Sequence, residues 1–308
     1  MKEVPKGHLA ILGVNLIFGL NTPITKSILS LHHIEPLALT FFRFVGAAVA
    51  FWIASFFVSS KHKATKKDIL LFFVASLLGI VLNQMFFVVG LSSTSPVDAS
   101  IIVTIVPILT MIIAAFYLKE PITTKKVAGV AIGCAGAVLL ILTGIRANDQ
   151  SSSLHGNLMC VISCLAYATY LTVFRDLIKR NHPVVLMKWL MLFAVVVTSP
   201  VCYKSVIAID YAALQMSEIV RVLYVVLMAT FVAYLLIAIG QARLRPTTLS
   251  MYNYFQPIVT TAISIAIGLD IFGWHKALAA ALVFLGVYIV TQSKSKAQMD
   301  AEKDTSHK

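Results

Sequence analysis

The sequence predicts an all-α integral membrane protein in which ten transmembrane helices form two inverted five-helix repeats. The first observation is composition: 59% of the 308 residues are hydrophobic, 12% are charged, and the mean hydropathy is +0.88. A chain with this low a share of charged residues cannot cover a water-exposed surface. Most of the protein surface must therefore face lipid. The second observation is an internal repeat, because residues 90–141 reappear without a gap 150 positions later, aligning Gly90, Pro96 and Pro107 with Gly240, Pro246 and Pro257.

Ten apolar segments follow one another, separated by short polar loops. A hydrocarbon core of about 30 Å needs a helix of about 20 residues, and most of the segments have this length. A soluble core could hide one such segment, but ten in succession leave almost no residues to face water. The predicted spans are residues 8–29, 36–58, 69–90, 97–118, 127–145, 155–174, 183–205, 219–240, 248–269 and 274–292.

Five spans in each repeat turn the second repeat upside down relative to the first, so the repeats are inverted. We expect the first repeat at residues 1–145, the second at 155–293 and a polar cytoplasmic tail at 294–308. The polar segment 144–154 is a hinge rather than a boundary between independent domains, since neither half could shield its polar faces from lipid alone.

The net charge of +12 would suggest nucleic-acid binding in a soluble chain. Here the distribution of the positive charges reflects the orientation of the chain in the membrane. With the N-terminus inside, 18 of the 25 Lys and Arg residues fall in cytoplasmic segments. We therefore expect no nucleic-acid partner, and both termini in the cytoplasm of a bacterium with the chain in its cytoplasmic (inner) membrane. The first apolar segment is too long for a signal peptide and lacks a small-residue cleavage site, so we expect it to remain as the first span.

Pro23, Pro107 and Pro257 predict breaks in spans one, four and nine. A proline inside a helix removes one backbone donor and leaves the carbonyl four residues earlier without its partner. In lipid this is tolerated only against protein or a water-filled cavity. Because Pro107 and Pro257 are repeat-related and near the middle of their spans, they point to a central site, although a bend that serves only packing stays open as an alternative.

Polar side chains inside the spans are the candidates for that site. Small and hydroxyl residues such as Ser163 often serve helix packing alone. Amides and tyrosines are costlier to bury, which favours an aqueous cavity around them. The predicted substrate-binding residues of this kind are Asn21, Asn83, Gln84, Tyr170, Tyr252, Asn253 and Gln256.

Arg43 is the clearest ionisable group within a span. Such a group at the bilayer centre costs about 2.5–3.5 kcal/mol on insertion scales, so it must meet a carbonyl, an acid or an anionic substrate. We therefore add Arg43 to the predicted substrate-binding residues, with a structural clamp between helices as the alternative. Lys26, Arg175 and Glu120 lie near span ends, where long side chains reach water and serve as anchors.

The sequence contains no recognisable catalytic motif. HExxH, GxSxG and Walker A patterns are absent, and the four cysteines show neither CxxC nor His/Cys ligand spacing. We therefore predict no enzyme activity, no catalytic residues, no metal and no cofactor. Without an ATPase signature, uphill transport would have to use an ion or exchange gradient, and a proton is one candidate for the coupling ion.

Several short motifs in order resemble the EamA-type branch of the drug/metabolite transporter superfamily over roughly residues 8–292. Phe18-Gly19-Leu20-Asn21 takes the place of that family's Trp-Gly-x-Asn, Arg43 follows in span two, and Leu118 to Thr123 resembles its Gly-Glu-x-x-Thr/Ser ending of span four. The resemblance implies ten helices in two inverted repeats and movement of small metabolites, often export of amino acids or their derivatives. Phe18 stands where the family usually has tryptophan. The resemblance to the family does not identify the ligand.

Together these observations predict a secondary transporter of a small metabolite that works by alternating access around a midplane cavity. By resemblance, it would export amino acids or related compounds. The alternative is a non-transporting membrane receptor or assembly protein built on the same bundle, which would show no substrate flux. The substrate, the direction of transport, the coupling ion and the oligomeric state are not encoded in any recognisable pattern.

Overall fold

The computed structural model describes residues 3–29, 31–58, 65–93, 99, 102–144, 154–256, 258–259, 262 and 274–293. Within these ranges every regular element is helical, and helix is present in each of the ten predicted spans. The first five spans are α1 (Glu3–Leu29), α2 (Pro36–Phe56), α3 (Lys66–Ser76) with η1 (Leu77–Leu82) and α4 (Asn83–Ser93), α6 (Val106–Tyr117), and α7 (Thr124–Gly144).

The second five spans repeat this order. They are α8 (Leu154–Val173), followed by the short α9 (Arg175–Arg180), then α10 (Pro183–Ile207), α11 (Met216–Val226) with η2 (Leu227–Val232) and α12 (Ala233–Arg243), α13 (Pro246–Met251) with η3 (Tyr252–Tyr254), and α15 (Trp274–Thr291). The tail predicted at residues 294–308 lies outside the described residues.

The surface of the bundle is that of a membrane protein. Five helical segments are long and apolar enough to cross a bilayer: Pro36–Phe56, Lys66–Ser93, Leu154–Val173, Pro183–Ile207 and Met216–Arg243. Large apolar side chains lie on the outside, with Phe56, Phe116 and Leu154 each at least 80% exposed. Five spanning helices with large apolar side chains exposed on the outside require lipid around them, so the chain is an integral, multi-pass membrane protein.

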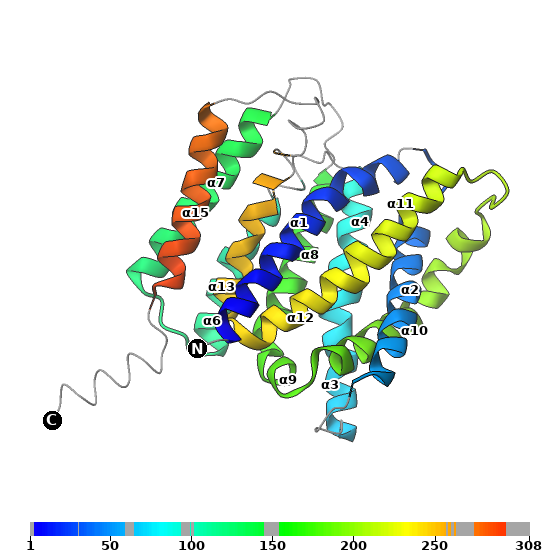
Figure 1. Cartoon of the computed structure of the whole chain (residues 1–308), viewed down its shortest axis with the longest axis horizontal. Coiled ribbons are helices and arrows are strands. Elements are labelled where there is room, and N and C mark those ends of the chain that lie inside the picture. The colour runs from blue at the N-terminus through cyan, green and yellow to red at the C-terminus, as the bar shows by residue number, and fades with distance from the viewer. Residues whose placement is uncertain are drawn as a thin grey trace.

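The two repeats agree in local detail. The third and eighth spans each contain a π-helical segment, η1 and η2, and the two segments lie 150 positions apart at both ends. Each of these spans also begins with a capping box, in which Thr65 pairs with Asp68 and Gln215 with Glu218. Their first turns lie at opposite ends of the bundle, with α3 beginning at the bottom and α11 at the upper right of Figure 1. The repeats are therefore inverted.

Local sequence explains where several helices begin. Prolines occupy the first turns of α2, α6, α10 and α13, where the missing amide proton needs no helical partner and the fixed φ angle favours the helix. The capping boxes of α3 and α11 satisfy two backbone amides each. These signals mark the start of the second, third and fourth spans of both repeats.

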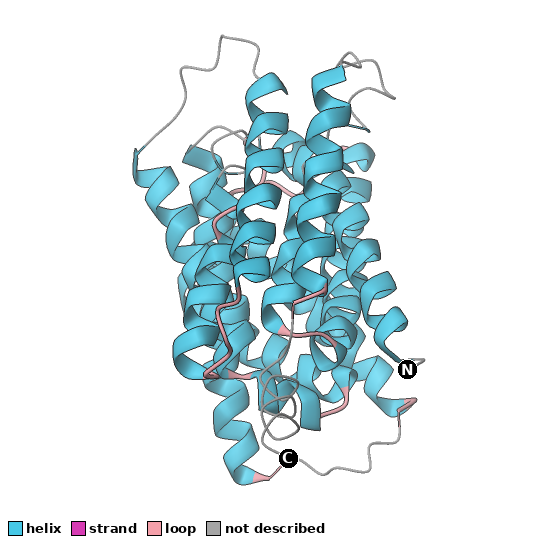
Figure 2. Ribbon diagram, turned by 90° about the vertical axis from the view of Figure 1, so that its left-hand side faces the viewer, coloured by secondary structure: helices cyan, strands magenta, loops and turns pink. Residues whose placement is uncertain are grey.

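The repeats pack against each other rather than side by side as separate domains. The most extensive helix pairs are α7 with α15, α2 with α10, α4 with α8, and α1 with α12, and α7 and α15 lie together at one edge in Figure 1. Figure 2 shows the helices as one bundle. Each pair joins a helix of the first repeat to one of the second, so the largest hydrophobic core is shared by both halves.

Glycines allow the closest of these contacts. A Cβ atom on Gly90 would lie 2.8 Å from the Gly156 carbonyl oxygen of α8, and its repeat partner Gly240 faces Gly7 and Ile11 of α1. Gly286 of α15 lies directly against the backbone of Gly129 in α7. Small residues at these crossings let the backbones approach, as they do in other transmembrane bundles.

Two of the predicted proline sites can be compared with the structure. Pro107 lies in the first turn of α6, directly after a turn at residues 104–105, so span four is broken where the sequence predicts. The backbone of α1 is helical across Pro23 without interruption. Pro257 lies outside the described residues, but the 3₁₀ segment η3 just before it interrupts span nine at the position repeat-related to the break in span four.

Candidate functional site

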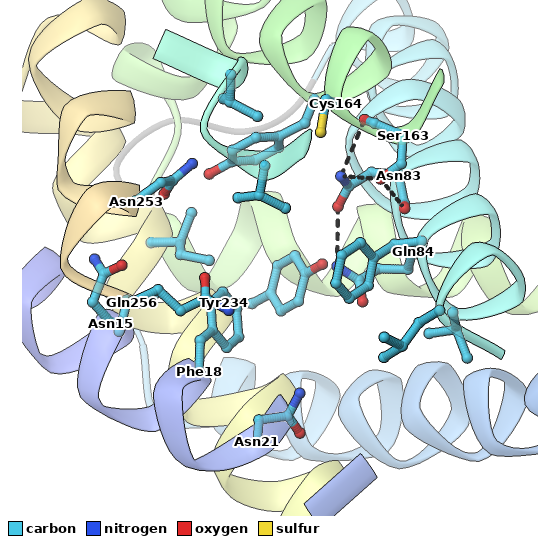
Figure 3. A pocket seen from close by; sticks show the side chains of 18 of the residues that line it. Asn15, Phe18, Asn21, Asn83, Gln84, Ser163, Cys164, Tyr234, Asn253 and Gln256 are labelled. Carbon is cyan, nitrogen blue, oxygen red and sulfur yellow. Dashed lines mark hydrogen bonds between the residues drawn. The ribbon is translucent and has the colours of Figure 1, made fainter. Parts of the chain in front are cut away.

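A cavity with a volume of about 110 Å³ lies between the two repeats. By volume it could hold on the order of ten water molecules. Spans one, two, three, four, six, eight and nine contribute to its wall (Figure 3). The polar lining residues are Asn15, Asn21, Thr25, Arg43, Asn83, Gln84, Ser163, Tyr167, Tyr234, Asn253 and Gln256, and the apolar ones include Phe18, Phe87, Leu91 and Ile237.

The lining follows the repeat symmetry. Many lining residues form pairs at a shift of 149 or 150 positions, the shift that relates the two halves of the sequence. These pairs are Val14 with Ser163, Asn15 with Cys164, Phe18 with Tyr167, Gln84 with Tyr234, Phe87 with Ile237, Val103 with Asn253, and Val106 with Gln256. The cavity therefore lies on the axis that relates the repeats, but several pairs place an apolar residue opposite a polar one. The positions that line the cavity are thus symmetric, whereas the polarity of the side chains at those positions is not.

Asn83 links span three to span six at one side of the cavity. Its amide nitrogen donates to the carbonyl and hydroxyl oxygens of Ser163 at 3.2 and 3.1 Å, and the Ser163 hydroxyl donates to the Asn83 carbonyl at 2.7 Å. Gln84 donates from its amide nitrogen to the Asn83 side-chain oxygen at 3.0 Å (Figure 3). Asn83 is thus held in place by the protein, whereas the remaining hydrogen-bonding capacity of Gln84 can serve a solute.

Arg43 brings a buried positive charge to the cavity. It is only 3% exposed, and its Nε donates to the Thr230 hydroxyl of η2 at 3.0 Å. Thr230 in turn donates to the carbonyl of Val225, five residues earlier, at 2.8 Å. Because η2 is π-helical, its backbone pattern places Thr230 where it can receive the guanidinium from the other repeat.

Six of the eight predicted substrate-binding residues line the cavity: Asn21, Arg43, Asn83, Gln84, Asn253 and Gln256. The other two lie elsewhere. Tyr170 is buried with its ring against Gly79, and its hydroxyl donates to Gln241 at 3.1 Å. Tyr252 makes a 2.6 Å hydrogen bond with Nδ1 of His8. Both tyrosines therefore lie outside the lining of this cavity, and their hydroxyls have protein partners.

Sequence reasoning missed Tyr234 and assigned Ser163 to packing alone. Tyr234 lies in α12 among apolar neighbours, but it is the repeat partner of Gln84, so applying the 150-residue shift to each predicted residue would have found it. Tyr167 is likewise the partner of Phe18 in the family-like motif. Repeat symmetry is therefore a stronger guide to this cavity than polarity.

The breaks in spans four and nine meet each other. The Tyr254 hydroxyl donates to the Thr104 carbonyl at 3.2 Å, and the two residues are themselves repeat-related. The hydrogen bond satisfies a carbonyl at the turn before α6. Both breaks border the cavity through Val103 and Asn253, as the predicted central site requires.

Two side-chain pairs, each containing a carboxylate, join the repeats away from the cavity. Arg180 in α9 pairs with Asp68 in the first turn of α3, and His33 pairs with Glu218 in the first turn of α11 at 3.0 Å. Asp68 and Glu218 are repeat-related, so the two pairs are equivalent contacts at opposite ends of the bundle.

Glu120, predicted as an anchor, holds a separate charge cluster. Its carboxylate lies 2.8 Å from Nζ of Lys126 and 3.8 Å from a terminal nitrogen of Arg175. Burial lowers the pKa of the neighbouring Lys179, and Arg175 lowers it further.

A multi-pass bundle of two inverted five-helix repeats around a polar cavity is the architecture of a secondary membrane transporter. The EamA-like transporter family matches residues 5–142 and 154–292, so this chain belongs to that family, which is part of the drug/metabolite transporter superfamily. A small-molecule substrate and a lipid bilayer are the partners this membership implies.

Relatives in bacteria, archaea and plants span nearly the whole chain. The uncharacterized transporter YyaM of Bacillus subtilis (strain 168) is 25% identical, with 91% of this chain and 92% of the relative covered. An uncharacterized transporter of Archaeoglobus fulgidus is 22% identical (86% and 92%), and the protein WALLS ARE THIN 1 of Arabidopsis thaliana is 24% identical (94% and 83%). One solved crystal structure shares the fold with a TM-score of 0.74 at 20% identity, covering 94% of this chain and 96% of that one.

Proposed function

We propose that this transporter carries a small metabolite by alternating access, with the two repeats rocking around the central cavity. The observation that carries the proposal is the position of the cavity on the repeat axis, walled by equivalent residues of both halves. In inverted-repeat transporters, exchange of the two repeats' conformations opens a central site to one side and then the other. The cavity volume of about 110 Å³ suits a solute with on the order of ten non-hydrogen atoms, such as an amino acid or a related compound.

The side-chain pairs at the two ends support this mechanism. Asp68–Arg180 and His33–Glu218 each join one repeat to the other, at opposite ends of the bundle. Opening either end would require its pair to separate, whereas the other pair could stay closed. Two equivalent contacts at opposite ends are what alternation between two repeat-related conformations requires.

We further propose the orientation that the basic residues favour, with both termini in the cytoplasm and the chain in the cytoplasmic (inner) membrane of a bacterium. In this orientation the Asp68–Arg180 pair lies at the cytoplasmic face and the His33–Glu218 pair at the outer face. Export is the proposed direction, and a proton gradient is the proposed driving force because the sequence contains no ATPase signature.

The test is transport in proteoliposomes. The purified chain is reconstituted, and uptake of a pooled metabolite library is followed by mass spectrometry with and without a pH gradient. Val103→Trp, which would fill the cavity, should abolish the selective flux, whereas Val49→Trp on the lipid-facing surface of α2 should retain it. Selective flux that both variants retain, or no flux through folded wild-type protein, would contradict the proposal and favour the receptor alternative.

A further inference from the structure

The Arg43 guanidinium is only partly satisfied by the protein. Of its five N–H groups, the one on Nε donates to Thr230. The two terminal nitrogens, which carry the other four, make no hydrogen bond to any described residue, and Arg43 is nevertheless 97% buried and lines the cavity. Four unused donors of a permanent cation therefore face the space between the repeats.

No counter-ion is visible in the lining. Among the described residues that line the cavity, Arg43 is the one with a permanent charge, and none is Asp or Glu. A buried cation without an anion carries a desolvation cost that neither the Thr230 hydroxyl nor the surrounding amides can offset. An anion that entered the cavity would supply the missing partner.

A structural clamp does not explain this arginine, because the fold does without a cation at the equivalent place in the other repeat. The equivalent helices α2 and α10 begin at Pro36 and Pro183, and this alignment places Leu190 at the position equivalent to Arg43. The 150-residue shift pairs Thr230 with Ile80 of η1, and both Leu190 and Ile80 are fully buried. The same helix crossing is thus built once from apolar side chains and once around a guanidinium.

We propose that the transported solute carries a carboxylate, which the terminal nitrogens of Arg43 bind as a bidentate pair at the crossing of α2 and η2. The planar guanidinium matches the two oxygens of a carboxylate. The wall formed by Phe18, Phe87 and Tyr234 suits an apolar or aromatic remainder of the solute, and Gln84 can hydrogen-bond a further polar group. This inference rests on the proposed transport function and names the substrate class for the same cavity.

The experiment compares carboxylic acids with their own amides on the full-length protein in detergent and in proteoliposomes. The probes are phenylalanine and phenylalaninamide, tryptophan and tryptophanamide, and benzoate and benzamide, with thermal stabilisation and counterflow as readouts. We expect at least one acid to bind and be transported, and its amide to bind at least about tenfold more weakly, because a charge-assisted bidentate contact is lost.

Variants locate the discrimination at Arg43. Arg43→Gln should remove the preference for the acid over the amide. Arg43→Lys should keep part of this preference, because lysine retains the positive charge but lacks the two parallel N–H donors of the guanidinium. The matched control is Lys188→Gln, which removes a cation from within span seven. Nζ of Lys188 lies 4.7 Å from the centre of the Trp52 ring, and Lys188 does not line the cavity. This control should leave the preference unchanged. If Arg43→Gln does not fold, Arg43→Lys carries the comparison.

The outcomes separate this inference from the transport function itself. Equal binding of acid and amide by wild-type protein, binding of no acid in the set, or an unchanged preference in the folded Arg43 variants would each overturn the carboxylate site. If the protein transports a neutral solute and Val103→Trp abolishes that flux, the transport proposal stands and only the carboxylate site is refuted. Absence of any selective flux would overturn the transport proposal instead.

Discussion

Replacing Gly286 with alanine tests a close backbone-to-backbone contact between the repeats. The added Cβ would lie 2.6 Å from the Gly129 carbonyl oxygen, 2.6 Å from the Gly133 nitrogen and 2.7 Å from the Gly133 Cα. All three neighbours are backbone atoms of α7, so no side chain can turn away to make room. The two helices must therefore separate by several tenths of an ångström or more along their most extensive contact.

Two effects of opposite sign determine the result. Alanine is favoured over glycine within a helix by about 1 kcal/mol, which would stabilise the variant. Overpacking a tight contact typically costs about 1–3 kcal/mol, and a backbone-to-backbone clash belongs at the upper end of that range. We expect a net loss of about 1–2 kcal/mol in the free energy of unfolding, which at about 1.4 kcal/mol per tenfold is roughly a 5- to 30-fold change in the folded-to-unfolded ratio.

The assay is reversible unfolding by SDS in mixed micelles, followed by circular dichroism. Gly13→Ala is the matched control, because its Cβ would lie 3.4 Å from the nearest atom, Cδ1 of Leu236, an ordinary contact distance. That variant should gain up to about 1 kcal/mol from helix propensity alone. If Gly286→Ala were stabilised as much as Gly13→Ala, the close approach of α7 and α15 would be wrong.

Three further predictions concern the site and the ends of the bundle. Tyr254→Phe should lower the free energy of unfolding by about 1 kcal/mol in the same SDS assay, since it removes the hydroxyl that donates to a carbonyl in the break of span four. Asn83→Ala should reduce the initial rate of proteoliposome uptake while the protein remains folded, because the amide that fixes span three to span six is lost; an unchanged rate would contradict this role. Asp68→Asn should release Arg180 and open that end of the bundle. In a background where Cys164 is the sole cysteine, a membrane-impermeant thiol reagent should then label Cys164 faster than it does with Asp68 present. Equal labelling rates would argue that the pair does not hold this end closed.

The sequence was sufficient to predict the spans and the inverted repeats, because lipid imposes length and apolarity on every helix. It could not decide which way each polar residue faces. In a span that is apolar all round, no hydrophobic stripe marks the buried side, so Tyr170 and Gln84 look alike as candidates. Only the structure shows that Tyr170 packs on Gly79 while Gln84 reaches the cavity.

The π-helical segments are a second feature that no local pattern revealed. One extra residue in a turn rotates everything that follows by about 100° around the helix axis, since an α-helix has 3.6 residues per turn. A helical projection drawn through span three or span eight as continuous α-helix therefore misplaces the residues after η1 or η2. Tyr234 lies two residues after η2, and Thr230 lies within η2, where it accepts the hydrogen bond from Arg43.

The agreement of the two π-helical segments constrains how the site arose from the fold. Because η1 and η2 occupy equivalent positions, the altered backbone belongs to the common five-helix unit rather than to either half. The side chains placed on that backbone have diverged: Ile80 closes the crossing of one repeat with apolar packing, while Thr230 holds a guanidinium in the other. In the proposed mechanism, the symmetric backbone would supply two conformations of similar energy, and the asymmetric side chains would give the solute one orientation within the cavity. Alternation between ends and selectivity for one solute class would thus depend on different parts of the same structure, the first on the repeat and the second on where the repeats differ.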